Sequence, residues 1–338
     1  MEKDEISVLL SYYYMLKTPE GDCRGTSNQL QNASGDVNRF SHYQSQKSSK
    51  KCPMNTQEVQ VQASSLLQIE VPRMKLNELR HLSIVDNNQQ KNQSKFANLI
   101  QRHGFVVLTD IGIVENNYNA LIAEFQNFIE NNDRQEKEKL KGPVYFNERG
   151  VPMWATGYER MPMREAVRAR AAAPHAQPWP AAGGLREAWE KTTKNLMQIA
   201  DRCLLLTLGA EQALTYKEVE EDDNFSVCYA LHYPNDESYP DEFAVTEHID
   251  PSLFVIEPCS NVDGLEVLDQ ATDTWISVED LCAPGRELVV FTGKALGAAT
   301  GGRVPGTRHR VRRSRGAVPR CCFIYEQKYA HYYPPPLD

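Results

Sequence analysis

Apolar residues follow a helical period in the first part of the chain. Over residues 95–103, 118–129 and 185–208 they recur every three to four positions, apart from a polar gap at Thr192 and Thr193, which is the spacing of a helix with one buried face. Gly104 and Gly209 directly follow the first and last of these segments and are suitable helix ends. A short apolar run at 105–108 predicts a buried strand. We therefore expect a mainly helical region with few strands before residue 220.

After residue 225 the pattern changes to short apolar or alternating runs separated by turn residues. Eight such runs predict strands, at residues 225–233, 244–248, 252–256, 264–268, 274–278, 287–292, 307–312 and 320–326. Eight short strands with this spacing are typical of a double-sheet jelly roll or a barrel. The predicted fold class is α+β.

Three regions follow from these patterns. Residues 1–60 include a stretch rich in Ser, Asn, Gln, Gly and Lys without an apolar period, which predicts a poorly ordered tail. Residues 61–220 form the mainly helical half with short strands, and residues 221–338 form the jelly-roll core. Within the helical half, the Ala-, Arg- and Pro-rich stretch 161–184 is expected to be a loop or lid.

Composition excludes several classes of protein. The 338 residues are 41% hydrophobic and 24% charged, as in ordinary globular proteins, and the formal net charge of -8 disfavours nucleic acid as a partner. None of the eight cysteines forms a Cys-x-x-Cys pair, so a thiolate zinc site is not expected. Apolar runs are far shorter than the roughly 18 residues of a membrane span. The acidic amino terminus resembles neither a secretory signal nor a transit peptide, so we expect a cytoplasmic protein.

A candidate metal site involves three residues. His248 and Asp250 stand two apart at a predicted strand, so their side chains leave the same face, and His309 lies in a later strand. Two imidazoles and one carboxylate on one face of an iron ion leave open positions for a co-substrate and O2. The His–Asp pair alone also fits an ordinary hydrogen bond at a strand end. The third ligand favours the metal.

Strand alternation separates the arginines near His309. If His309 points inward, Arg308, Arg310 and Arg312 point outward. Arg320 begins the last predicted strand, where its planar guanidinium would suit a carboxylate, although a surface position is the alternative. The alternation in that last strand does not decide which face is inside.

Several motifs, taken together, resemble one enzyme family. They are His248-Ile-Asp250, Gly264-Leu-Glu-Val, Trp275-Ile-Ser-Val, Gly301-Gly-Arg, His309-Arg-Val311 and Arg320. Their order and spacing are similar to the isopenicillin-N-synthase-like branch of the 2-oxoglutarate/iron(II) dioxygenases, over about residues 79–329. The resemblance implies a distorted double-stranded β-helix with flanking helices.

The resemblance also implies cofactors and their ligands. Fe(II) would be held by His248, Asp250 and His309, and O2 and 2-oxoglutarate would be co-substrates, with succinate and CO2 as products. Arg320 and Tyr233 would bind 2-oxoglutarate. Cys322 stands where the family usually has a serine and is a weaker hydrogen-bond donor.

The chain contains segments that correspond to those contacting the substrate in the family. Five residues of these segments are candidates for binding the substrate, namely Trp154, Tyr158, Arg160, Arg164 and Phe254. Arginines beside aromatic residues suit a small anionic molecule with a carboxylate, although a solvated surface is the alternative for each arginine. The expected chemistry is C–H activation in specialised metabolism, by hydroxylation, desaturation or ring closure, for example kainoid-synthase-like cyclisation of an N-prenylated amino acid.

Two other functions remain open from the sequence. One is an iron oxidase of the same fold that does not use 2-oxoglutarate, and the other is a catalytically inactive binding module. The sequence determines neither the substrate nor the oligomeric state.

Overall fold

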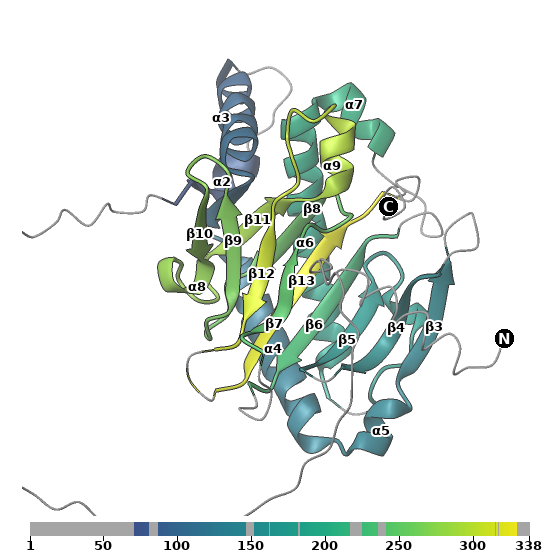
Figure 1. The fold of residues 1–338 in the computed structure, drawn as a ribbon. Coiled ribbons are helices and arrows are strands. Elements are labelled where there is room, and N and C mark those ends of the chain that lie inside the picture. The colour runs from purple at the N-terminus through teal and green to yellow at the C-terminus, as the bar shows by residue number, and fades with distance from the viewer. Residues whose placement is uncertain are drawn as a thin grey trace, which may run out of the picture. The chain divides into compact units, whose positions relative to one another are not determined.

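The strands of the described part of the chain form two sheets (Figure 1). The computed structural model describes residues 71–80, 87–146, 152–161, 163–181, 183–216, 225–235, 241–314, 316 and 318–329, so the predicted tail over 1–60 lies outside it. The large sheet has the order β1-β2-β11-β8-β13-β6-β5-β4-β3, and the small sheet has the order β10-β9-β12-β7.

The strands have the following bounds: β1 (Arg73–Lys75), β2 (Phe105–Thr109), β3 (Lys141–Phe146), β4 (Pro152–Met161), β5 (Arg164–Arg170), β6 (Val227–Tyr233), β7 (Phe243–His248), β8 (Phe254–Pro258), β9 (Leu265–Asp269), β10 (Thr274–Ser277), β11 (Leu288–Thr292), β12 (His309–Arg312) and β13 (Arg320–Gln327). Each of the eight strands predicted after residue 225 is present, shifted by at most two residues at either end. The α+β class and the double-stranded β-helix are confirmed.

The helices have the following bounds: α2 (Leu76–Arg80), α3 (Asn87–His103), α4 (Ile113–Asn131), α5 (Arg134–Glu138), η1 (Pro174–Ala176), α6 (Leu185–Leu208), α7 (Ala210–Tyr216), α8 (Val278–Leu281) and α9 (Lys294–Ala299). The three longest, α3, α4 and α6, pack against strands of the large sheet, and α8 contacts β9 of the small sheet. Helix α6 has the predicted bounds and packs against α3, α4, β8 and β13 (Figure 1). Its Trp189 is fully buried, with its ring edge-to-face on Phe323 of β13 at 4.8 Å between ring centroids. This layer forms the main hydrophobic core.

The expected loop or lid at 161–184 is wrong over part of its length. Strand β5 lies there, hydrogen-bonded between β4 and β6. Alanine and arginine favour helices, so composition concealed the alternation of the strand, and pairing with two neighbours overrides local propensity. The large sheet therefore contains strands from both sides of the boundary predicted at residue 220.

Gly104 ends α3 in a conformation that suits glycine. Its φ is 80°, and its N–H donates to the Ile100 carbonyl at 2.9 Å. A Cβ there would lie 2.6 Å from Thr307 Oγ1, so a side chain would both strain the backbone and displace a neighbour.

We expect Gly104→Ala to lower the free energy of unfolding more than Gly112→Ala does. Gly112 also has a positive φ, of 56°, but a Cβ there would meet no atom within 4 Å. Its ψ is -113°, so Gly112→Ala should cost only the strain of this unusual backbone conformation, about 1–3 kcal/mol. Urea unfolding of both variants measures the difference, and equal losses would show that crowding at Gly104 is unimportant.

Candidate active site

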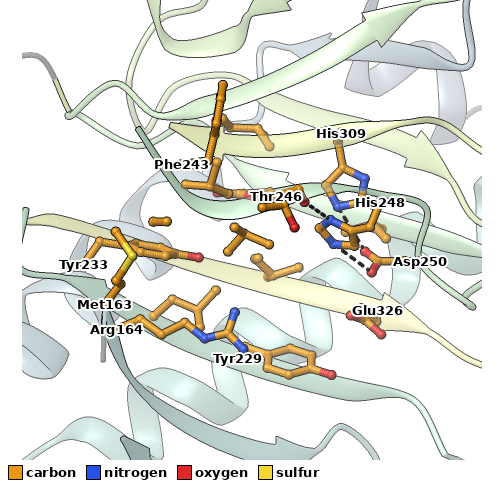
Figure 2. Close-up of a pocket in the computed structure, with 18 of the residues that line it drawn as sticks. Met163, Arg164, Tyr229, Tyr233, Phe243, Thr246, His248, Asp250, His309 and Glu326 are labelled. Carbon is orange, nitrogen blue, oxygen red and sulfur yellow. Dashed lines mark hydrogen bonds and ion pairs between the residues drawn. The ribbon is translucent and has the colours of Figure 1, made fainter. Parts of the chain in front are cut away.

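A cavity of about 440 Å3 lies between the two sheets (Figure 2). The small sheet and the turn after β7 contribute one wall, with Phe243, Val245, Thr246, His248, Asp250, Leu265, His309 and Val311. The large sheet contributes the other wall, with Arg164, Tyr229, Leu231, Tyr233, Val255, Glu257, Phe291, Ile324 and Glu326. Most of these residues are apolar or aromatic, so the few charged groups define its chemistry.

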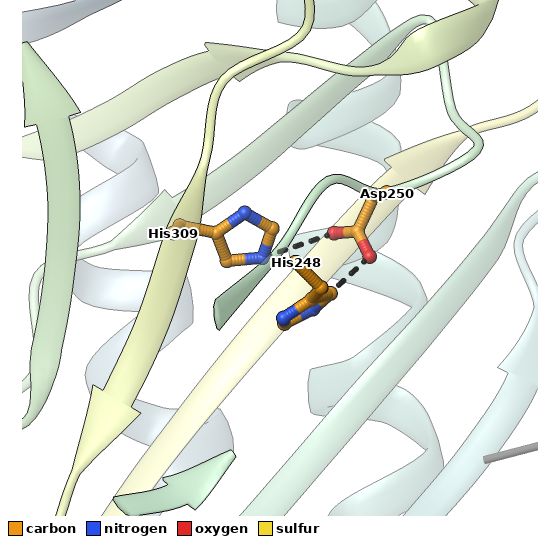
Figure 3. Close-up of side chains that lie close together, drawn as sticks. All are labelled: His248, Asp250 and His309. Atoms are coloured by element: carbon orange, nitrogen blue, oxygen red, sulfur yellow. Dashed lines mark ion pairs between the residues drawn. The ribbon is translucent and has the colours of Figure 1, made fainter. Parts of the chain in front are cut away.

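His248, Asp250 and His309 converge at this cavity (Figure 3). His309 on β12 is the cross-strand partner of His248 at the end of β7, and Asp250 follows two residues later. Asp250 Oδ1 lies 3.4 Å from His248 Nε2, and Asp250 Oδ2 lies 3.3 Å from His309 Nε2. One ligand atom of each residue lies within 4.8 Å of the other two. Two nitrogens and one carboxylate oxygen at this separation fit Fe(II).

Backbone groups orient the ligands. His248 Nδ1 lies 2.8 Å from the Thr246 carbonyl oxygen, and His309 Nδ1 lies 3.3 Å from the Thr307 carbonyl oxygen. A carbonyl accepts only, so each histidine carries its proton on Nδ1 and leaves the Nε2 lone pair for a metal. The Asp250 carbonyl accepts the Lys294 N–H at 2.8 Å, which holds the turn after β7.

The triad is electrostatically coupled. Burial raises the pKa of Asp250, but the charges and hydrogen bonds of His309 and His248 outweigh it, so this pKa lies well below its usual range. Burial lowers the pKa of His309, but Asp250 outweighs it and the net pKa is raised. A cation bound here would take over the role of the positive charge that His309 presents to Asp250.

The structure brings Arg320, Tyr233 and Cys322 together beside the cavity. Arg320 is 1% exposed and lies opposite Tyr233 in the β13–β6 register. Its Nη1 donates to Cys322 Sγ at 3.0 Å, and its guanidinium carbon lies 5.6 Å from the centroid of the Tyr233 ring. Gly264 leaves room for it, because a Cβ at that position would lie 2.8 Å from Arg320 Cδ.

Two glutamates that the sequence analysis missed also contact Arg320. Its Nη2 donates to Glu257 Oε1 at 2.8 Å and to Glu279 Oε1 at 2.6 Å. Both carboxylates are almost fully buried. The available signal was a glutamate at 257, directly after the apolar end of the strand predicted at 252–256.

The predicted substrate residues divide between two faces of the large sheet. Arg164 lines the cavity, across from His248 (Figure 2). Tyr158 and Arg160 alternate to the other face, where Tyr158 packs on Phe128 of α4 and donates to Glu165 Oε2 at 2.9 Å. Arg160 is exposed. The expectation that these two residues bind substrate is therefore wrong.

Phe254 is fully buried and packs against Phe96 of α3, with 6.4 Å between ring centroids, so its predicted role at the substrate is also wrong. The next residue of β8, Val255, points to the opposite face of the strand and lines the cavity. Trp154 belongs to β4, but its side chain lies outside the described part of the structure.

Four further arginines, in β5 and at residues 308–312, form ion pairs with glutamates. Arg168 is 2% exposed, forms an ion pair with Glu159 at 3.0 Å and lies over the Tyr229 ring. Arg308, Arg310 and Arg312 point away from His309, as predicted from strand alternation, and form ion pairs with glutamates outside the cavity.

A cluster of two histidines and one carboxylate inside a double-stranded β-helix is typical of non-haem iron oxygenases. Residues 221–327, which contain His248, Asp250 and His309, match the family model described as the 2OG-Fe(II) oxygenase superfamily. The matched residues are about a third of the chain, and members of that superfamily use Fe(II), 2-oxoglutarate and O2. The match agrees with the family and the cofactors that the sequence predicted.

Solved structures share the fold. The dioxygenase for auxin oxidation from rice is 19% identical, with a TM-score of 0.58 over 77% of this chain and 83% of that one. A full-length Neurospora crassa protein, solved in complex with alpha-KG and 5-formyluracil, is 16% identical, with a TM-score of 0.61 over 77% and 85% of the two chains.

One curated relative is similar in sequence. The Schizosaccharomyces pombe sexual differentiation process protein isp7 is 29% identical over 143 residues. The aligned stretch covers 41% of this chain and 34% of that protein. Among the helices that the structure describes, none is long and apolar enough to cross a membrane.

Proposed function

We propose that this chain is an Fe(II)- and 2-oxoglutarate-dependent oxygenase that oxidises a C–H bond of a small, carboxylate-bearing molecule. The observation that supports this is the position of Arg164, which lies in the wall of the same cavity as the metal-binding triad. A cavity of about 440 Å3 with mostly apolar walls is suited to a small molecule.

The charged groups of the cavity have separate roles in this proposal. Bound Fe(II) supplies the activation of O2, and His248, Asp250 and His309 hold it. Arg320, Tyr233 and Cys322 bind the co-substrate at the buried end. Arg164 binds the carboxylate of the substrate and so orients its C–H bond toward the metal, since a guanidinium presents two parallel donors to a carboxylate.

The first experiment measures succinate release from 2-oxoglutarate across a panel of small molecules. Small carboxylic acids would be compared with thymine and 5-formyluracil, which are uncharged heterocycles. We expect acids to stimulate succinate release and the uncharged compounds to leave it at the background rate. Stimulation by the uncharged compounds alone would contradict the anionic substrate.

The composition of the product identifies the type of oxidation. Gain of one oxygen atom indicates hydroxylation, and loss of two hydrogen atoms indicates desaturation or ring closure, which nuclear magnetic resonance separates. A kainoid-type cyclisation in specialised metabolism is one such outcome. O2 uptake that needs no 2-oxoglutarate would favour the iron oxidase, and absence of uptake with every compound would favour the inactive module.

Arg164→Gln is expected to weaken binding of the acidic substrate by tenfold or more. Loss of a hydrogen bond to a charged group costs roughly 1.5–3 kcal/mol, and about 1.4 kcal/mol corresponds to a factor of ten. Slow succinate release without substrate should persist, because Arg164 is not a contact of the metal ligands in this proposal. Apparent affinity and uncoupled turnover are the two measurements.

Arg160→Gln is the matched control for this prediction. Arg160 belongs to the neighbouring strand, carries the same charge and alternates to the opposite face of the sheet. The Arg160→Gln substitution should leave both the apparent affinity for the substrate and the uncoupled turnover unchanged. Equal effects of the two substitutions would remove the assignment of Arg164.

A further inference from the structure

Arg320 already contacts two carboxylates of the protein itself. Glu257 Oε1 and Glu279 Oε1 both accept hydrogen bonds from Nη2. One positive charge therefore faces two carboxylates. A 2-oxoglutarate carboxylate directed at Arg320 would be the third carboxylate on a single guanidinium, in a site that excludes water. Buried like charges repel strongly unless one of them is neutralised.

The two glutamates differ in their access to the cavity. Glu257 lines the cavity, whereas Arg320 does not. Glu279 lies behind, on the short helix α8, and its Oε2 accepts the Leu265 N–H at 3.0 Å. An anion that approaches Arg320 from the metal therefore meets Glu257 first. Glu279 stays bound to the backbone of β9.

The groups around this cluster come from five elements. They are Tyr118 of α4, Tyr233 of β6, Cys259 after β8, Cys322 of β13 and His309 of β12. Burial raises the pKa of Tyr118, Tyr233 and Cys322, and a hydrogen bond to Cys282 together with burial raises that of Cys259, so these four groups are neutral near pH 7. Among the described residues that contact Arg320, only Glu257 and Glu279 can balance its charge.

We propose that Glu257 and Glu279 couple 2-oxoglutarate binding to the uptake of one proton from solvent. The proton goes to the glutamate pair and leaves Arg320 with two charged carboxylates instead of three. Burial already raises the pKa of Glu279 above its usual value, which is consistent with a carboxyl group able to accept that proton. The inference rests on the proposed function, because it requires 2-oxoglutarate to bind at Arg320.

The sign of the pH dependence follows from linkage. A ligand that takes up a proton on binding binds more tightly at lower pH. The dissociation constant of 2-oxoglutarate should rise by up to about tenfold per pH unit, over the pH range in which binding takes up the proton. An arginine without competing carboxylates would bind 2-oxoglutarate with nearly constant affinity over this range.

Titration calorimetry tests the proposal without turnover. The full chain is loaded anaerobically with Mn(II) in place of Fe(II), and 2-oxoglutarate is titrated at several pH values in two buffers with different ionisation enthalpies. The difference between the buffers counts the protons taken up. We expect uptake of about one proton by the wild-type protein. We expect uptake well below that by Glu257→Gln, with tighter binding at high pH.

Glu266→Gln is the control for a change of charge alone. Glu266 is a buried carboxylate that pairs with Arg310 at 2.6 Å and Arg312 at 3.1 Å, away from the cavity. It should keep the wild-type proton uptake. Absence of proton uptake in the wild-type protein, or equal uptake in Glu257→Gln, overturns the proposal.

If Glu257→Gln does not fold, the same titration of Glu279→Gln and of the wild-type protein decides the question. Two further results separate this inference from the function on which it rests. If 2-oxoglutarate fails to bind the Mn(II)-loaded wild-type protein at every pH, the proposed function fails as well. Binding without any proton uptake refutes the inference alone.

Discussion

Asp250→Ala is expected to abolish stoichiometric Fe(II) binding while the protein remains folded. The carboxylate is the one oxygen ligand of the triad, with an oxygen 3.3–3.4 Å from each histidine nitrogen. Loss of a residue that only supports a ligand weakens metal binding by about 10–100-fold, so loss of the ligand itself should exceed that. The fold should persist because Asp250 lies in a turn after β7, outside the hydrophobic clusters.

The measurement is anaerobic Fe(II) binding, with circular dichroism as the test of folding. Asp241→Ala is the matched control, because Asp241 also lines the cavity but is not one of the three clustered ligands. It should bind one equivalent of Fe(II). Full iron binding by Asp250→Ala would show that the metal is held elsewhere.

Arg320→Leu is expected to destabilise the protein and to weaken 2-oxoglutarate binding together. Removal of the guanidinium leaves Glu257 and Glu279 buried without a cation, and an uncompensated buried charge costs about 3–5 kcal/mol of unfolding free energy. Loss of the carboxylate partner should also weaken 2-oxoglutarate at least about tenfold. Urea unfolding and anaerobic titration measure the two effects.

A triple variant separates these effects. Combining Arg320→Leu with Glu257→Gln and Glu279→Gln removes the unbalanced charges, so it should recover much of the lost stability. It should not recover 2-oxoglutarate affinity, because the cation is still missing. Recovery of both would mean that Arg320 holds the fold and does not bind the co-substrate.

The sequence by itself determined the strands of the core and the candidate metal ligands. Short strands between turn residues are a local pattern, and all eight predicted strands after residue 225 lie where expected. His248 and Asp250 could be paired because their spacing is also local, and strand alternation placed Arg308, Arg310 and Arg312 outside. The order of the family motifs added His309.

Only the tertiary structure decided what surrounds those residues. Strand β5 depends on hydrogen bonds to β4 and β6, and these bonds place Arg164 in the cavity and Arg160 on the opposite face. Arg320 meets Glu257 and Glu279 because β8, β13 and the helix after β10 converge at one point. The physical reason is that buried charges are paired by packing between elements distant in sequence, which no local period records.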